Sequence, residues 1–212
     1  MRLRHIPGGR AFLAAHPSHI LLDPPAHRGG WRSLFGNDRP LHLEVGMGKG
    51  QFVMGMARQN PEVNHLGMER ADSVAVRALQ RLLAEPLPNV RLVVGCATGL
   101  EVAFGEGEVD RLYLNFSDPW PKKAHAKRRL THVDFLDRYR KVLAPGAELH
   151  FKTDNRGLFE FSLAHLSQHG WRFETVSLDL HAAEPEDNVR TEYEEAFAAE
   201  GHPIYRLVAR PV

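Results

Sequence analysis

Short apolar runs alternate with amphipathic segments along most of the chain, and this alternation restricts the possible folds more than any other feature. Apolar residues that recur every three or four positions predict helices, and short, nearly continuous apolar runs predict buried strands. Such strands alternating with longer helices are typical of βαβ units, in which helices cover both faces of a parallel sheet. The expected strands are residues 41–45, 64–69, 90–94, 112–116, 147–152, 173–180 and 204–209, and the expected helices are residues 51–59, 73–83, 133–143 and 158–169. The pattern therefore predicts an α/β fold.

Residues 1–39 do not follow this alternation. They are rich in proline, glycine and arginine, which predicts an extended N-terminal arm with at most a short helix near residues 11–15. The rest of the 212-residue chain shows no internal repeat, low-complexity tract or linker. We therefore expect an arm of residues 1–39 and one domain of residues 40–212.

Composition excludes several classes of protein. The single cysteine, Cys96, excludes an internal disulfide and a four-thiolate zinc site. No apolar run approaches the ~20 residues of a membrane-spanning helix, and the first residues lack the apolar segment of a signal peptide, so we expect a cytoplasmic protein with no membrane partner. His165 and His169 are spaced to hold a metal from one helix face, but no third ligand has a matching spacing, and we predict no metal site.

A glycine-rich turn follows the first expected strand. Gly46, Gly48 and Gly50 permit a backbone conformation that lets a ligand approach closely, but their spacing differs from the G-x-G-x-x-G of dinucleotide-binding proteins. Glu44, within that strand, would repel a pyrophosphate and suits a cationic ligand. Glu69 ends the second strand, where a carboxylate can accept hydrogen bonds from ribose hydroxyls. Together these residues predict binding of S-adenosylmethionine, which carries an ammonium and a sulfonium.

A second group of residues with candidate functional side chains follows the fourth expected strand. Asp118 precedes Pro119, and Trp120 stands between Pro119 and Pro121, so the prolines restrict the backbone of this loop. Ligands of open α/β sheets lie beyond the carboxyl ends of the strands, so these side chains should face the same crevice as Gly46. A rigid acid beside an aromatic face suits a flat base extruded from its stack. A proline-stiffened loop around a packed tryptophan is the structural alternative.

Basic residues cluster directly after this loop. The net charge is only +1, from 27 basic and 26 acidic residues, but no acid lies between Asp118 and Asp134. A local basic patch on a nearly neutral protein indicates contact with nucleic-acid phosphates, although most charge runs are simply solvated. The segment comprises Lys122, Lys123, Ala124, His125, Ala126, Lys127, Arg128 and Arg129.

Two later segments have both functional and structural interpretations. Asp154 follows the fifth expected strand, where a carboxylate serves a ligand or caps the next helix. Thr191 and Glu194 have the spacing of a capping box at a helix N-terminus, and spacing alone assigns them no function.

Several longer strings carry a resemblance to a known family. With NFSDPWPKK, HAKRRL, FKTDNRGLFEFSL, VSLDLH and TEYEEAF, together with RHIP and FGNDRPLHLEVGMGKGQF, the chain resembles the bacterial tRNA (guanine-N7-)-methyltransferase family, TrmB, essentially from end to end. The resemblance implies a Rossmann-like class I methyltransferase fold, with a mostly parallel seven-stranded sheet ending in an antiparallel strand. It also implies transfer of a methyl group from S-adenosylmethionine to N7 of the guanine at position 46, in the variable loop of tRNA.

The resemblance also implies roles for individual residues. The expected cofactor-binding residues are Glu44, Gly46, Gly48, Glu69, Cys96 and Asp118. The expected substrate-binding residues are Lys122, Asp154, Thr191, Glu192, Tyr193 and Glu194, and the expected RNA-binding residues are Ala124, His125, Ala126, Lys127, Arg128 and Arg129. Asp118 and Asp154 are the expected catalytic residues. The implied partners are tRNA and S-adenosylmethionine, with both a monomer and a homodimer left open.

The chain departs from the family pattern in three respects, at four positions. Cys96 stands where the family usually has an acid or an amide that addresses the adenine. A thiol is a poor acceptor, so we expect weaker donor binding or a backbone contact in its place. With Ala124 and Ala126, the basic segment has fewer basic residues than is usual in the family, and Ala196 stands where the family generally has lysine.

Guanine N7 has a lone pair and no proton, so its methylation needs no general base and depends on positioning. Either Asp154 or Glu194 would hold the N1–H and N2–H₂ edge of guanine, while Lys122 would address O6 or a phosphate. Two alternative functions share the fold: a methyltransferase acting on an exocyclic base amine, and a non-catalytic RNA-binding module.

Overall fold

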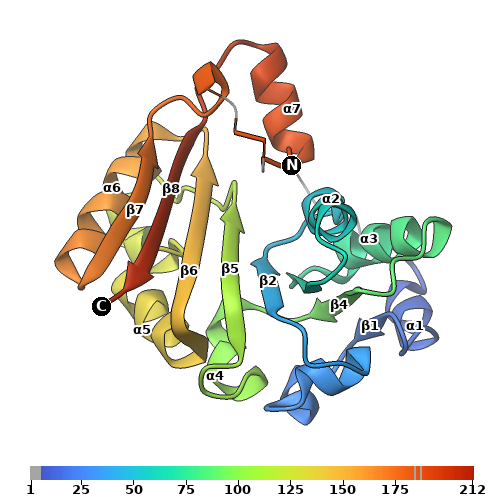
Figure 1. Cartoon of the computed structure of the whole chain (residues 1–212). Helices are drawn as coiled ribbons and strands as arrows, with labels where there is room; N and C mark the ends of the chain where they lie inside the picture. Colours follow the sequence, from blue (N-terminus) through green and yellow to red (C-terminus); the bar gives the residue numbers. More distant parts are fainter. Residues whose placement is uncertain (1–5, 184, 187) are drawn as a thin grey trace.

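The computed structural model describes residues 6–183, 185–186 and 188–212, which form one twisted sheet with helices on both faces (Figure 1). The sheet contains eight strands in the order β1-β4-β3-β2-β5-β6-β8-β7. All neighbouring strands pair in parallel except β8, which is antiparallel to both β6 and β7. The strands are β1 (Ile20–Leu21), β2 (Leu41–Val45), β3 (Asn64–Glu69), β4 (Val90–Val94), β5 (Val109–Asn115), β6 (Leu143–Thr153), β7 (Trp171–Ser177) and β8 (Tyr205–Pro211).

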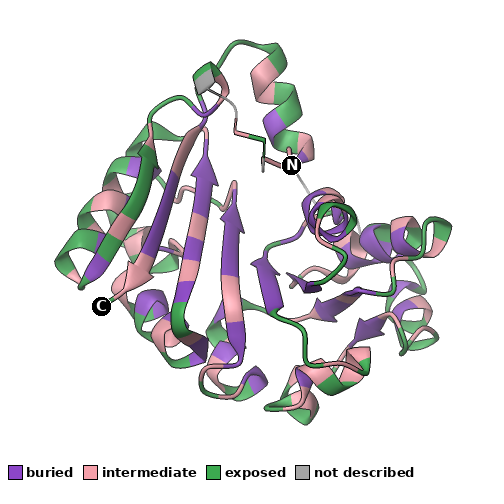
Figure 2. Ribbon diagram, in the orientation of Figure 1, coloured by how far each residue is buried: buried purple, intermediate pink, exposed green. Residues whose placement is uncertain are grey.

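The helices form two layers, each with its own apolar cluster. Residues of α1 to α3 pack with Leu92 of β4, whereas residues of α4 to α6 pack with Val93 of the same strand. Successive side chains of a strand point to opposite faces, so these two residues place the two layers on opposite sides of the sheet. The central strands are accordingly almost wholly buried (Figure 2). The helices are α1 (Gly9–Ala14), α2 (Gln51–Gln59), α3 (Asp72–Ala84), α4 (Leu100–Ala103), α5 (Val133–Val142), α6 (Arg156–Gln168) and α7 (Glu192–Ala199).

The described part of the N-terminal region is not the extended arm that the sequence predicts. Leu13 of α1 and Trp31 are fully buried, and Ile20 of β1 pairs with Leu92 of β4. The Glu108 carboxylate accepts hydrogen bonds from the backbone N–H groups of Gly29 and Trp31 at 2.9 Å. A few apolar side chains and one buried carboxylate therefore hold this region to the domain. Its two-residue strand β1 is too short to recognise in the sequence, and it raises the number of strands from seven to eight.

The predicted α/β fold is confirmed, and the errors lie mainly at element ends. The fifth predicted strand is longer, β6 being Leu143–Thr153, and the sixth ends earlier, at Ser177. The capping box is confirmed: Thr191 Oγ1 accepts from the Glu194 N–H, and the Glu194 side chain accepts from the Thr191 N–H. None of the described helices is long and apolar enough to cross a membrane.

Candidate functional site

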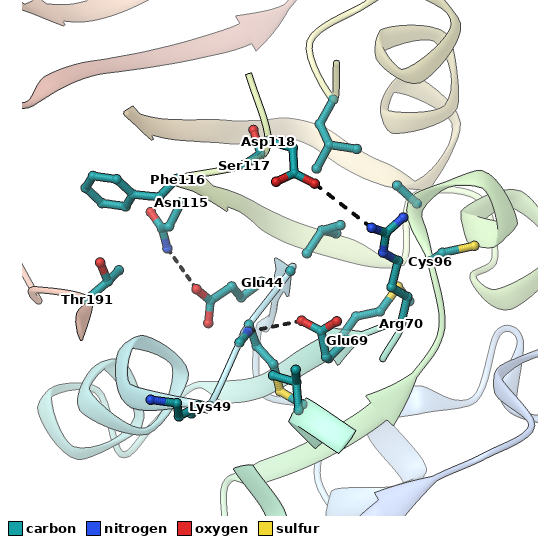
Figure 3. Close-up of a pocket in the computed structure, with 18 of the residues that line it drawn as sticks. Glu44, Lys49, Glu69, Arg70, Cys96, Asn115, Phe116, Ser117, Asp118 and Thr191 are labelled. Atoms are coloured by element: carbon teal, nitrogen blue, oxygen red, sulfur yellow. Dashed lines mark hydrogen bonds and ion pairs between the residues drawn. The ribbon is translucent and has the colours of Figure 1, made fainter. Parts of the chain in front are cut away.

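One large open pocket of about 1880 Å³ lies beyond the carboxyl ends of β2, β3, β4 and β5. Glu44, Glu69 and Asp118 all line it, so the three acids predicted to converge do so. Figure 3 shows Glu44 between two sides of the pocket, with Asp118, Arg70 and Cys96 on one side and Phe116 and Thr191 on the other. Of the remaining predicted site residues, Gly46, Gly48, Lys127, Arg128, Glu192 and Tyr193 also line the pocket.

Glu44 is a buried carboxylate with one unused oxygen. Its Oε1 accepts a hydrogen bond from Asn115 Nδ2 at 3.0 Å, whereas Oε2 has no hydrogen-bond partner among the described residues. Burial raises the pKa of Glu44 to about 7, while Asn115, the charge of Lys152 and the nearby Val53 backbone favour the ionised form. A buried acceptor without a partner costs free energy, so this oxygen is suited to a cationic donor group from a ligand.

The glycine-rich turn lies under the same pocket. Gly46 and Gly48 have φ values of 84° and 56°, which side-chain-bearing residues rarely adopt. A Cβ at either position would meet no atom within 4 Å, so the backbone faces open space. Glu69 holds the turn, since Oε2 accepts from the Gly48 N–H at 3.3 Å and Oε1 accepts from the Ala71 N–H at 2.9 Å.

The loop after β5 is strained where it enters the pocket. Phe116 and Trp120 have φ values of 50° and 44°, which cost non-glycine residues of order 1 kcal/mol or more. Between them, the Asp118 carboxylate lies 4.0 Å from the guanidinium of Arg70, and both side chains are largely exposed. Cys96 also lines this side of the pocket, and its Sγ lies 2.8 Å from Thr98 Oγ1.

The basic segment divides into two parts. Lys127 and Arg128 are exposed and line the pocket, with the Arg128 guanidinium 4.8 Å from the centre of the Trp120 ring. Arg129 donates hydrogen bonds to the carbonyls of Pro119 and Trp120 and stacks on Phe161. Its predicted contact with RNA therefore competes with holding the loop in place. Lys122, Ala124, His125 and Ala126 lie in or beside a 3₁₀ turn outside the residues that line the pocket.

Helix α7 is tied to the glycine-rich turn through Glu192. Its carboxylate pairs with Lys49 at 2.8 Å and with Arg81 at 2.7 Å. Although burial opposes ionisation, these two cations hold the pKa of Glu192 below its ordinary value. Glu192 therefore connects α7 with α3 and with the glycine-rich turn before α2, and it still borders the pocket.

The prediction that Glu194 contacts the substrate does not fit the structure. Glu194 is fully buried and does not line the pocket. Its Oε2 accepts from Lys152 Nζ at 2.6 Å, and its Oε1 accepts from Asn188 Nδ2 at 2.8 Å and lies 3.1 Å from His181 Nε2. Burial opposes ionisation, but these partners hold the pKa of Glu194 below its ordinary value. All of its acceptor capacity is used within the protein.

Lys152 is the counterpart that sequence reasoning missed. Its ammonium donates to Glu194, to Asn188 Oδ1 at 3.0 Å and to the Val189 carbonyl at 2.9 Å. Burial lowers the pKa of Lys152, against the charge of Glu194. Asp154, two residues further on, is half-buried and lies outside the lining of the pocket, while Asn155 caps α6 by accepting from the Leu158 N–H. A lysine within a strand that is predicted to be buried is the signal that could have identified Lys152.

Solved methyltransferase structures share the fold. An antibiotic-related methyltransferase superposes with a TM-score of 0.66 at 18% identity, covering 86% of this chain and 93% of that chain. A 16S rRNA (adenine(1408)-N(1))-methyltransferase variant from Catenulisporales acidiphilia, solved with its cosubstrate SAM, has a TM-score of 0.61 at 18% identity, covering 90% and 91%. The predicted Rossmann-like class I methyltransferase architecture is therefore confirmed.

Sequence comparison identifies closer relatives. Residues 38–207 match the family model described as "Putative methyltransferase". The chain is 54% identical over 209 residues to a tRNA (guanine-N(7)-)-methyltransferase of Exiguobacterium sp., covering 99% of this chain and 97% of that protein. It is 53% identical over 209 residues to the enzyme of the same description from Streptococcus sanguinis, covering 99% of each. The chain therefore belongs to the tRNA (guanine-N(7)-)-methyltransferase family.

Proposed function

We propose that this chain is an enzyme that transfers the methyl group of S-adenosylmethionine to N7 of a guanine in tRNA, at position 46 of the variable loop. The observation that carries the proposal is Glu44, which lines the pocket with Glu69 and Asp118 and has a buried oxygen without a hydrogen-bond partner among the described residues. A tRNA substrate also supports the cytoplasmic location predicted from the sequence.

The residues of the pocket fit the methyl donor. The unpaired Oε2 of Glu44 is suited to the donor's ammonium, and the turn at Gly46 and Gly48 leaves room for its amino-acid portion. We assign Glu69 and Asp118 to its ribose and base, because both line the pocket with Cys96. S-adenosylmethionine, when bound, supplies a methyl group activated by a positively charged sulfur.

The chain's own contribution to the reaction is positioning and charge. The N7–methyl bond forms as the sulfur–methyl bond breaks, and the bonding pair stays on sulfur, so positive charge moves to the guanine. Glu44 and Asp118 add negative charge to the pocket in which this transfer takes place, and negative charge favours the cation as it forms on guanine. No side chain has to accept a proton from N7, and the strained loop at Phe116 and Trp120 supplies a rigid wall.

The residues nearest α7 and the basic segment form the substrate side of the pocket. We assign Thr191 and Tyr193 to the base, and Lys127 and Arg128 to tRNA phosphates, because these four residues line the pocket. Lys122 and Asp154 are assigned to RNA further from the reacting atoms.

The raised pKa of Glu44 predicts proton release on donor binding. Below pH 7 the free protein carries a proton on this carboxyl, and a bound ammonium favours the ionised form. Donor binding at pH 6 should therefore release close to one proton, and affinity should rise between pH 6 and pH 7.5. Calorimetry in two buffers of different ionisation enthalpy measures the release. Methylthioadenosine, which lacks the ammonium, should release none; equal release with both ligands would contradict the assignment.

The basic segment predicts a salt-dependent contribution to tRNA binding. Each phosphate contact adds about 0.7–0.9 to the slope of log affinity against log salt concentration. Replacing Lys127 and Arg128 by alanine should therefore lower the slope by about 1.5, whereas Lys141→Ala, on the far end of α5, should leave it unchanged. The measurement is tRNA binding at several salt concentrations. An unaltered slope in the double variant would show that Lys127 and Arg128 do not contact tRNA phosphates.

The direct test of function is incubation with unmodified tRNA and S-adenosylmethionine labelled in its methyl group. We expect the label in 7-methylguanosine at position 46. Label on an exocyclic amine would favour the alternative methyltransferase, and failure to bind the donor by calorimetry would favour a non-catalytic RNA-binding module.

A further inference from the structure

Two aromatic rings from distant parts of the chain lie parallel in the pocket. Phe116 follows β5, and Tyr193 lies in the first turn of α7. Their ring centres are 6.4 Å apart and their planes differ by 18°. Other parallel pairs with this spacing, such as Phe151 and Phe159, are buried in the core. Among the described parallel pairs, Phe116 and Tyr193 are the one whose two rings both line the pocket.

Neither ring is placed there by core packing. Tyr193 is 59% exposed, although large aromatic side chains usually bury most of their surface. Phe116 is half-buried and has a φ of 50°, a conformation that is costly for a phenylalanine. This conformation directs Phe116 to the Thr191 side of the pocket, whereas Asp118, two residues later, faces Arg70 and Cys96 on the other side (Figure 3). Backbone strain of this kind is usually retained where it serves a ligand.

The distance between the two ring centres is close to that of two rings that hold one flat group between them. A base stacks about 3.4 Å from its neighbour, so two rings that overlap face to face around one base have centres about 6.8 Å apart. RNA-binding proteins commonly hold an unstacked base on aromatic side chains. We infer that Phe116 and Tyr193 form an aromatic clamp that stacks the target guanine from both sides, with Glu44 and Asn115 at the floor of the pocket beside it. This inference rests on the proposed function.

The clamp separates two tasks within one pocket. The acids at Glu69 and Asp118 serve the donor, whereas the clamp holds only the substrate base. Replacing either ring should therefore lower kcat/KM for tRNA and leave donor affinity unchanged. Because both rings act on one base, replacing both should lower kcat/KM for tRNA by less than the product of the two fold-losses of the single variants.

The test compares Tyr193→Leu and Phe116→Leu with the ring-preserving variants Tyr193→Phe and Phe116→Tyr. Stacking on an aromatic ring is worth ~1–3 kcal/mol per base, so each leucine variant should lower kcat/KM for tRNA by about 5- to 150-fold. The ring-preserving variants should stay within about threefold of the wild type, and calorimetry should give donor Kd values within twofold for all four.

Three results would overturn the clamp: full activity in Phe116→Leu, full activity in Tyr193→Leu, or an equal loss of donor affinity in either. Tyr193 is exposed, so its replacement tests the clamp even if Phe116→Leu unfolds. The wild-type protein in the same assay tests the proposed function separately, since absence of 7-methylguanosine there would reject that function and not the clamp alone.

Discussion

Replacing Glu44 by glutamine should weaken S-adenosylmethionine binding by about 3 kcal/mol, or roughly 150-fold, without unfolding the protein. Glutamine keeps the shape of the side chain and an oxygen for the hydrogen bond from Asn115 Nδ2. It removes the negative charge that the free Oε2 offers to the donor's ammonium. The site is buried, so little solvent screens the lost attraction.

Although donor binding weakens, the thermal stability of Glu44→Gln should equal or exceed that of the wild-type protein. The pKa of Glu44 in the folded protein is about 7, above its ordinary value of 4.5, so folding favours the protonated form. The cost of the ionised form therefore appears as pH rises from 4.5 through 7 and is fully present above pH 7. Glu44→Gln should melt at or above the wild-type temperature at pH 8 and close to it at pH 5.

Calorimetry with the donor and thermal melting at the two pH values measure both effects. Glu62→Gln, at an exposed glutamate, is the matched control and should alter neither. Donor affinity within threefold of the wild type in Glu44→Gln would contradict the assignment of this carboxylate to the ammonium.

Residues close to the ends of parallel strands could be placed from the sequence. Glu44 and Glu69 belong to neighbouring strands, and Asp118 follows a third, so the geometry of a parallel sheet brings them to one edge. The glycine-rich turn and the capping box at Thr191 were also readable, because each depends on residues close together in the chain.

Contacts between distant segments could not be predicted in the same way. Whether Glu194 can contact the substrate depends on its burial and on its pairing with Lys152, 42 residues away. Arg129 has the same sequence signal as Lys127 and Arg128, yet two carbonyls of the preceding loop occupy it. The N-terminal region likewise becomes ordered through Glu108, which lies far from it in the sequence.

The buried pair of Lys152 and Glu194 should be the most sensitive point for the stability of the α7 region. The ammonium and the carboxylate have exposed side-chain fractions of 6% and 0% and are 2.6 Å apart. Lys152→Met would leave the Glu194 carboxylate buried beside Asn188 and His181 without its main counter-charge. Losing one partner of a buried pair typically costs ~3–5 kcal/mol. For a chain of this size, that corresponds to a fall in melting temperature of roughly 10 °C.

The double variant Lys152→Met with Glu194→Met separates an anchoring role from a substrate contact. Without either charge, two apolar side chains fill the site, and such replacements of buried pairs are often neutral or stabilising. The double variant should therefore recover most of the stability lost by Lys152→Met, with a coupling energy of at least ~1 kcal/mol in the double-mutant cycle. It should still raise the KM for tRNA, because Asn188 Oδ1 and the Val189 carbonyl, in the segment that leads into α7, lose the ammonium that holds them. Additive losses of stability in the cycle would show that the two side chains act independently, and would return Glu194 to the candidates for direct contact with guanine.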